Sequence, residues 1–223
     1  FDRQDPAYSA PLPADRRLAY PWLEFERREN TFITTSNLSQ LFRNEDVSLG
    51  EEWRLRVGAT NGWLPSATDA LIVEFDYDNT VGFGAHHLLR TTVTADLHWD
   101  ETAGVWVDSV YGAAARYDYL IDPDNRWHAQ LSLDAGRGLS ADRLLKAGGD
   151  TLLRGYPAGW QQGDRRLVLN VERRHFYRRH VFNLFRLGSA AFAEVGQAWD
   201  RSGTLTQSER VLADIGIGLR INS

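Results

Sequence analysis

Apolar and polar residues alternate along most of this chain, so that every second side chain is hydrophobic. The clearest example runs from Leu89 to Trp99, where Leu, Thr, Val, Ala, Leu and Trp occupy the odd-numbered positions and polar residues the even ones. Successive side chains of a β-strand point to opposite faces of a sheet, so this period of two predicts strands with one apolar and one polar face. The same pattern recurs in segments 23–26, 53–57, 71–78, 111–119, 127–134, 166–172, 191–199 and 213–221.

The pattern predicts an all-β, antiparallel fold in which residues 17–223 form part of a transmembrane β-barrel with about nine or ten strands. Several segments extend over roughly ten residues, which suits a tilted membrane strand better than a sandwich strand of about five to six residues. A soluble β-barrel or sandwich stays open as the alternative, because its strands also have one apolar and one polar face.

Few segments depart from the strand pattern. Residues 1–16 contain three prolines among charged residues and are expected to form a linker or loop. Helix is expected only at 36–42 and 140–146, each with one or two turns, because elsewhere the period of two dominates.

Composition narrows the function classes. The net charge of −5 provides no basic field for nucleic acid, and the absence of Cys excludes disulfides, thiolate metal sites and thiol nucleophiles. No stretch approaches 18 consecutive apolar residues, so no membrane-spanning helix is expected. Barrel strands can still cross a membrane, because polar and apolar residues average out along them. The chain begins at Phe1 without Met or a signal peptide, and we interpret it as a fragment of a longer mature protein.

One short stretch stands apart from the strands: residues 148–156 read G-G-D-T-L-L-R-G-Y. A guanidinium is always charged and offers five donors in a fixed fork, so Arg154 would need carboxylates if its loop folded inward. Alternation places Glu172 and Glu194 on the polar faces of two consecutive strands, within reach of such a loop. The alternative is that Arg154 is a solvated hairpin residue and both glutamates are ordinary surface acids.

These residues resemble the outer-membrane assembly and translocation barrels of the BamA, TamA and two-partner-secretion transporter type, the bacterial surface antigen superfamily. In that family an R-G-F or R-G-Y tip packs inside the barrel, and Arg154-Gly155-Tyr156 matches it. The family's inward glutamate on the next strand is matched by Glu172, and its F-x-D-x-G strand by Phe192-Ala193-Glu194-Val195-Gly196, with Glu in place of Asp. The G-x-G-x-R sequence at 216–220 also fits.

The firm resemblance covers residues 145–223 and implies a family barrel of sixteen strands. Segment 165–176 would be the twelfth strand, so two closing strands would follow Ser223 and about six would precede Arg17. The inward-folded loop would occupy about 138–164. Arg154, Gly155 and Tyr156 would form the loop tip, and Glu172, Phe192, Glu194 and Gly196 the barrel wall that receives it.

The resemblance implies a pore in the bacterial outer membrane that translocates proteins or inserts outer-membrane proteins. It implies no enzyme activity and no cofactor. The expected partners are outer-membrane lipid, an unfolded or partly folded client protein, and periplasmic domains in the same longer chain. The alternative function is a barrel that anchors an N-terminally fused enzyme, such as a patatin-like lipase.

Three other motifs give only weak indications of a metal, catalytic or cofactor site. His86 and His87 are adjacent, and adjacent strand residues point to opposite faces, so a shared metal ion is not expected. Ser132 and His128 share a face, but no orienting third residue stands at a useful spacing for a catalytic triad. The G-x-G-x-x-A match at 136–141 lacks the alternating strands and long helices of a dinucleotide site, and we interpret it as a loop.

Two sets of charged residues remain. Acids recur on the predicted inward faces and are interpreted as a hydrophilic lining, namely Asp76, Asp78, Asp96, Asp118 and Asp134. A basic cluster is expected in a short periplasmic turn, solvated or in contact with an upstream domain, and comprises Arg173, Arg174, His175, Arg178, Arg179 and His180.

Overall fold

The computed structural model describes residues 17–36, 44–61, 64, 68–181, 185–201 and 210–222. The linker or loop expected at 1–16 lies outside these residues, as does the helix expected at 36–42 apart from Ser36, which ends a strand. The described residues form no α-helix, and none of their helical turns is long and apolar enough to cross a membrane.

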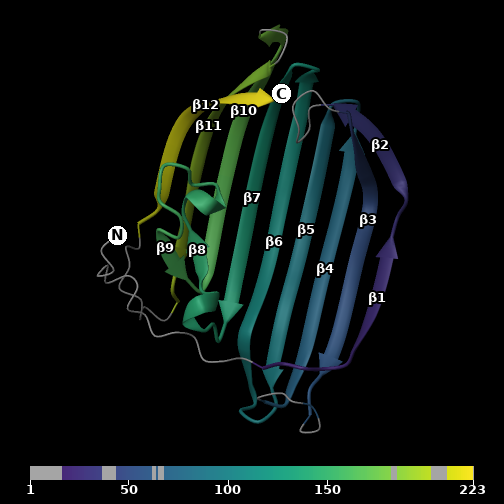
Figure 1. Cartoon of the computed structure of the whole chain (residues 1–223), viewed down its shortest axis with the longest axis vertical. Helices are drawn as coiled ribbons and strands as arrows, with labels where there is room; N and C mark the ends of the chain where they lie inside the picture. Colours follow the sequence, from purple (N-terminus) through teal and green to yellow (C-terminus); the bar gives the residue numbers. More distant parts are fainter. Residues whose placement is uncertain are drawn as a thin grey trace.

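Ten strands form one antiparallel sheet, which confirms the prediction of an all-β, antiparallel fold (Figure 1). Neighbouring strands follow chain order, as expected when long hairpins connect strands of matching alternation. The strands are β1 (Trp22–Arg28), β2 (Thr31–Ser36), β3 (Asn44–Ala59), β4 (Ala70–Phe83), β5 (His87–Asp100), β6 (Val105–Asp122), β7 (Asn125–Arg137), β10 (Arg165–Val181), β11 (Phe185–Trp199) and β12 (Leu212–Asn222).

The sheet is open. At one edge β1 and β2 both pair with β3, and at the other edge β12 pairs with β11. No hydrogen-bonded ladder joins β1 to β12 among the described strands, so the sheet does not close into a barrel. Each edge strand therefore has a hydrogen-bonded neighbour on one side only.

The pairing register keeps odd-numbered residues opposite odd-numbered ones over nearly the whole sheet. One cross-strand row, for example, consists of Tyr117, Ala129, Val171, Ala193 and Ile215. The alternation in the sequence therefore becomes two faces, one lined mainly by odd-numbered apolar residues and one mainly by even-numbered polar residues. We call them the apolar face and the polar face.

Strand β10 is longer than predicted. It extends beyond the expected end at residue 176 to Val181. Arg173 and Arg174 therefore lie within a strand and pair with Trp127 and Arg126 of β7, so their assignment to a turn was wrong. A run of charged residues resembles a turn in the sequence, but here the ladder with β7 and β11 carries it through the sheet.

Residues 138–164 leave the sheet between β7 and β10 and lie against the polar face over β10 and β11 (Figure 1). This loop contains two 3-10 turns, η2 (Ala141–Arg143) and η3 (Gly149–Thr151), and the small hairpin of β8 (Leu145–Ala147) and β9 (Gln161–Gly163). The helix expected at 140–146 is therefore one 3-10 turn followed by a short strand.

A β-bulge fixes the start of this loop. The β5–β6 register shifts between Asp96 and His98, and nearby Asp108 has a φ of 47°. The Asp108 carboxylate then accepts a hydrogen bond of 2.7 Å from the backbone N–H of Ser140. Gly138 has a φ of 63° there, a conformation that favours glycine.

Candidate functional site: an arginine–carboxylate cluster beneath the loop

A buried leucine holds the tip of the loop on the sheet. Leu153 is fully buried in a small apolar cluster with Ala147, Val168, Ala198 and Leu212. Its backbone N–H donates to Gly148 O at 3.1 Å, and its carbonyl accepts from the N–H of Tyr156 at 3.0 Å. These bonds close a tight turn around residues 148–156, so the next side chain, Arg154, faces the strands below.

Arg154 contacts both glutamates that alternation had placed near it. Its Nη2 forms an ion pair with Glu172 Oε1, and its Nε lies 3.3 Å from Glu194 Oε1. The backbone N–H of Arg154 donates to Glu194 Oε2 at 2.8 Å, and the guanidinium carbon lies 4.4 Å from the centre of the Phe192 ring. The tip is thus held by two ion pairs, a charge-assisted hydrogen bond from the backbone and a cation–π contact.

Glu172 has further partners that sequence reasoning missed. Its side chain has no exposed surface, and its Oε2 accepts from Arg174 Nε at 2.7 Å and from Arg220 Nη2 at 3.1 Å. Three guanidinium groups thus surround one carboxylate, which satisfies the hydrogen-bonding capacity of a buried charge. Arg174 could have been found from alternation, because it stands two residues after Glu172 and so shares its face.

Glu194 is buried too and bridges the loop to two strands. Besides Arg154, its Oε1 accepts from Asn170 Nδ2 at 2.7 Å. Asp214 pairs directly with Glu194 across β11 and β12, and its Oδ2 accepts from the backbone N–H of Gly155 at 3.1 Å. Asp214 was also missed, since its sequence context gives no sign of contact with the loop.

Gly155 and Gly196 are placed where a side chain would not fit. A Cβ on Gly155 would lie 2.9 Å from the Asp214 Cβ, and a Cβ on Gly196 would lie 2.8 Å from the carbonyl oxygen of Leu167. Tyr156 reaches the sheet edge, where its hydroxyl donates to Ala213 O at 3.1 Å and accepts from Ala213 N at 3.2 Å. The tyrosine therefore occupies backbone groups that β12 would otherwise expose at its edge.

The structure thus brings all seven residues of the predicted site into one region. We call Arg154, Glu172, Glu194, Arg174, Arg220 and Asp214, together with the Phe192 ring, the latch cluster. Its chemistry is that of strong, mutually satisfied charge pairs, which can hold a loop in place.

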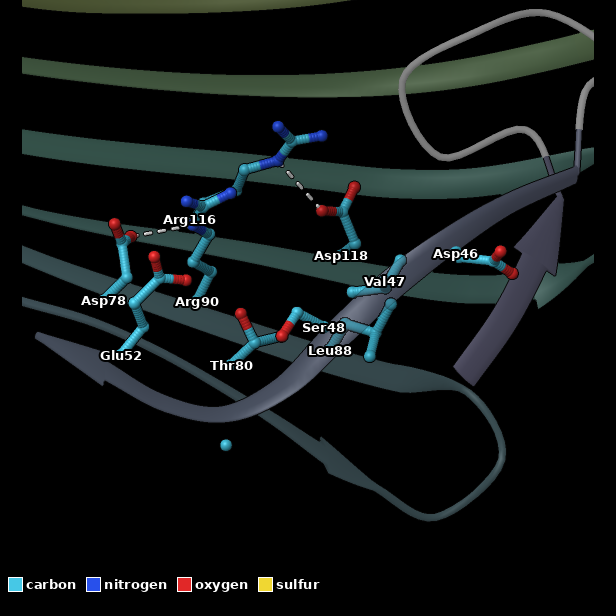
Figure 2. A pocket seen from close by; sticks show the side chains of 11 residues that line it. Asp46, Val47, Ser48, Glu52, Asp78, Thr80, Leu88, Arg90, Arg116 and Asp118 are labelled. Atoms are coloured by element: carbon cyan, nitrogen blue, oxygen red, sulfur yellow. Dashed lines mark hydrogen bonds and ion pairs between the residues drawn. The ribbon is translucent and has the colours of Figure 1, made fainter. Parts of the chain in front are cut away.

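A second group of charges lies on the polar face over β3 to β6 (Figure 2). Arg90 Nε contacts Asp78 Oδ1 at 2.9 Å, and Arg116 Nε contacts Asp118 Oδ2 at 3.2 Å. The two arginines are directly paired across β5 and β6. They line a cavity of about 240 Å³ that is floored by paired charges.

The predicted acidic lining lies on this polar face. Each of these acids forms an ion pair with an arginine on a neighbouring strand, on the loop or, for Asp118, on its own strand. The pairs are Asp76–Arg54, Asp78–Arg90, Asp96–Arg143, Asp118–Arg116 and Asp134–Arg166. The face is therefore hydrophilic because it carries both acidic and basic side chains.

His128 has an orienting carboxylate, contrary to the sequence-based expectation. Its Nδ1 lies 3.0 Å from Asp118 Oδ1, and both side chains are buried. Ser132 is four residues away along β7, about 13 Å at the usual strand rise, so it is out of hydrogen-bonding reach of His128. The arrangement lacks the nucleophile–base contact that a catalytic triad needs.

The adjacent histidines point to different partners. His86 Nδ1 lies 2.8 Å from the carbonyl oxygen of Leu120, and His87 Nδ1 lies 2.6 Å from the Tyr117 hydroxyl. In the ranges that the structure describes, no three His, Asp or Glu side chains converge as metal ligands.

Comparison of the chain with protein families, with curated proteins and with solved structures gave no match.

Proposed function

We propose that this chain is part of a β-barrel of the bacterial outer membrane that forms a pore for protein translocation or for insertion of outer-membrane proteins. The loop 138–164 would lie inside the barrel, held by the latch cluster. Further strands would pair along the edges at β1, β2 and β12, since open edges cannot face lipid.

The observation that carries this proposal is an inverted pattern of burial. Charged and polar side chains such as Glu172, Glu194 and Asp118 are buried, whereas large apolar side chains on the opposite face are exposed, up to 88% for Ile217. In water such a face would strongly favour association, because burying apolar area stabilises by about 25 cal/mol per Å². A lipid bilayer is the solvent that suits it.

The apolar face of β10 has a hydrophobic stretch with an arginine at each end, which supports the proposed membrane location. Leu167, Leu169 and Val171 point to the apolar face, with Arg165 before them and Arg173 after them. The eight residue steps from Arg165 to Arg173 span about 26 Å, or about 20 Å along the normal of a barrel whose strands tilt by about 40°, which is slightly less than the roughly 25 Å apolar band of outer-membrane barrels. Arg165 pairs with Trp199, and Arg173 lies 5.6 Å from the centre of the Trp127 ring, which gives each boundary an aromatic residue.

Two single-cysteine variants on one strand test the orientation of the sheet. The chain has no native Cys, so Val93→Cys and Thr92→Cys each introduce a single thiol, on the apolar and the polar face of β5 respectively. We expect a bimane probe at position 93 in phospholipid vesicles to be quenched by lipid-borne nitroxides and the probe at position 92 by a water-soluble quencher. Equal quenching of both probes by the water-soluble reagent would refute the membrane orientation.

The pore itself is tested by ion conductance across planar lipid bilayers. We expect channels from the reconstituted protein, with larger conductance when Arg154→Ala frees the loop from the wall. Insertion without any conductance in either form would leave an anchor rather than a pore, and would contradict the proposal.

A further inference from the structure

Three arginines gather at the end of the sheet from which the loop departs. Arg137 ends β7, Arg165 begins β10, and Arg201 follows β11; together with Tyr111 and Asp164 they line a cleft of about 550 Å³. Alternation places Tyr111 and Arg165 on the apolar face, so the cleft opens beside the surface that we assign to lipid. It is separate from the latch cluster, which lies on the polar face.

Positive charge exceeds negative charge in this cleft. Asp164 is the one carboxylate among its lining residues: it lies 3.3 Å from Arg165 Nη1 and accepts from the backbone N–H of Arg201 at 3.0 Å. The guanidinium groups of Arg137 and Arg201 form no ion pair with any residue of the described ranges, and both residues are exposed. As far as the described part of the chain is concerned, two guanidinium forks are therefore available to an anion.

The surroundings indicate which kind of anion. Tyr111, Ala135, Arg165 and Trp199 form one cross-strand row on the apolar face. The row below it, toward the middle of the sheet, contains Leu133 and Leu167. A ligand seated on the arginines would thus have charged partners at one end and apolar surface next to it. A lipid has this division of charge and apolar chain, whereas a free anion would leave the apolar side unused.

We propose that Arg137, Arg165 and Arg201 bind the phosphate of a lipid headgroup, whose acyl chains lie along the apolar face. Guanidinium groups bind phosphate oxygens through parallel, charge-assisted hydrogen bonds, and the presence of three arginines along one cleft suits a multiply charged group. Tyr111 and Trp199 lie at the level where aromatic side chains favour the headgroup region. This inference rests on the proposed membrane location and adds a specific lipid contact to it.

Native mass spectrometry of the protein in detergent, with phosphatidic acid as the probe, tests the proposal. On the unaltered chain we expect phosphatidic acid to bind and diacylglycerol, which lacks the phosphate, not to bind. The double variant Arg137→Gln/Arg201→Gln should weaken binding at least about tenfold, because it removes two charge-assisted contacts. Arg165 is left intact, since its Nη1 donates to the carbonyl oxygen of Gly136.

The matched control is Arg54→Gln/Arg90→Gln, which removes the same charge from the polar face. We expect its affinity for phosphatidic acid to stay within about twofold of the unaltered chain, since distant exposed charges are screened. An equal loss in both double variants would indicate general electrostatics and overturn the site. Binding of inorganic phosphate as tight as that of phosphatidic acid would show a free-anion site and overturn the lipid assignment.

The lipid site and the proposed function can fail independently of each other. If the protein inserts into phosphatidylcholine vesicles with the apolar face toward lipid but binds phosphatidic acid no better than diacylglycerol, only the lipid site fails. If the protein does not insert at all, the proposed function fails.

Discussion

Arg154 reaches the sheet through side-chain contacts with Glu172, Glu194 and Phe192, in addition to its backbone bond to Glu194. Arg154→Ala removes all three side-chain contacts but keeps the backbone bond and the buried Leu153. We expect the loop to detach more readily, at a cost of about 1–3 kcal/mol for lost charge-assisted contacts that solvent partly replaces. Tryptic cleavage after Arg143 and Lys146 in the loop should then be roughly tenfold faster or more.

Arg90→Ala is the control for this experiment. Arg90 lies on the same polar face and also contacts one carboxylate, but it does not touch the loop. We expect its loop cleavage to match that of the unaltered protein, with insertion into vesicles unchanged in both variants. Cleavage equally fast in Arg90→Ala would show that the loop does not depend on the latch cluster.

The two glutamates should respond differently to neutralisation. Glu172→Gln leaves Arg154, Arg174 and Arg220 close together without their shared carboxylate, so we expect a loss of about 3–5 kcal/mol, typical of a broken buried pair. Glu194→Gln should cost less, because Glu194 contacts one guanidinium of the described residues, that of Arg154, rather than three. The amide oxygen also still accepts from one of the two other donors, the Asn170 amide or the backbone N–H of Arg154. Urea unfolding in vesicles, followed by tryptophan fluorescence, measures both. A larger loss in Glu194→Gln would contradict this ranking.

At this scale the sequence predicted only part of the cluster. Glu172 and Glu194 could be placed on the polar face, since a strand fixes the face of every second side chain, whereas Arg154 lies in a loop and its contact with them was implied by the family resemblance. Arg220 and Asp214 could not be assigned to the cluster, because their contacts with β10 and the loop depend on how β12 pairs with β11. Such register is set by cross-strand packing that no local pattern records.

At the scale of single elements, β12 has a glycine at the point where an aromatic ring of β11 lies against it. Gly216 pairs with Phe192, and a Cβ at position 216 would overlap the Phe192 ring, which also contacts the Arg154 guanidinium. We expect Gly216→Ala to displace this ring and to cost about 1–3 kcal/mol, as overpacking usually does. Denaturant unfolding measures the loss, and faster loop cleavage should accompany it.

Gly218→Ala is the matched control, on the same strand and the same face. A Cβ at position 218 would meet no atom within 4 Å. We expect it to be neutral or slightly stabilising, because alanine lowers the entropy of the unfolded chain. Equal destabilisation by both substitutions would mean that β12 itself requires glycine, and that the contact with Phe192 is not the reason.

The elements that sequence reasoning placed wrongly are those fixed by distant contacts. Residues 140–146 have helix-compatible composition, but Asp108 holds Ser140 and β9 pairs with Leu145–Ala147, which leaves room for one 3-10 turn. Strand β10 continues through a charged run because β7 pairs with it as far as His175 and β11 as far as Val181. Tertiary pairing overrides local propensity in both cases.

For the molecule as a whole, the two faces of the sheet imply opposite responses to the same substitution. Leu131 lies mid-strand on the apolar face of β7 with 36% of its surface exposed, and Gln130 is its neighbour on the polar face. In water, Leu131→Arg at such an exposed position would be nearly neutral and would aid solubility. In a bilayer the same change should cost about 2–4 kcal/mol, because an arginine near the midplane must leave water.

Urea titration of the protein folded into phosphatidylcholine vesicles decides between these two expected effects of Leu131→Arg on the free energy of unfolding. We expect Leu131→Arg to lower the free energy of unfolding by that amount. The size-matched control Gln130→Arg should lower it by less than about 1 kcal/mol, because the new guanidinium stays hydrated on the polar face. Its repulsion by Arg116, which stands directly opposite, is limited to the size of one cross-strand pair. A stable, more soluble Leu131→Arg protein that needs no lipid would contradict the membrane assignment, because the apolar face would then have water rather than acyl chains as its solvent.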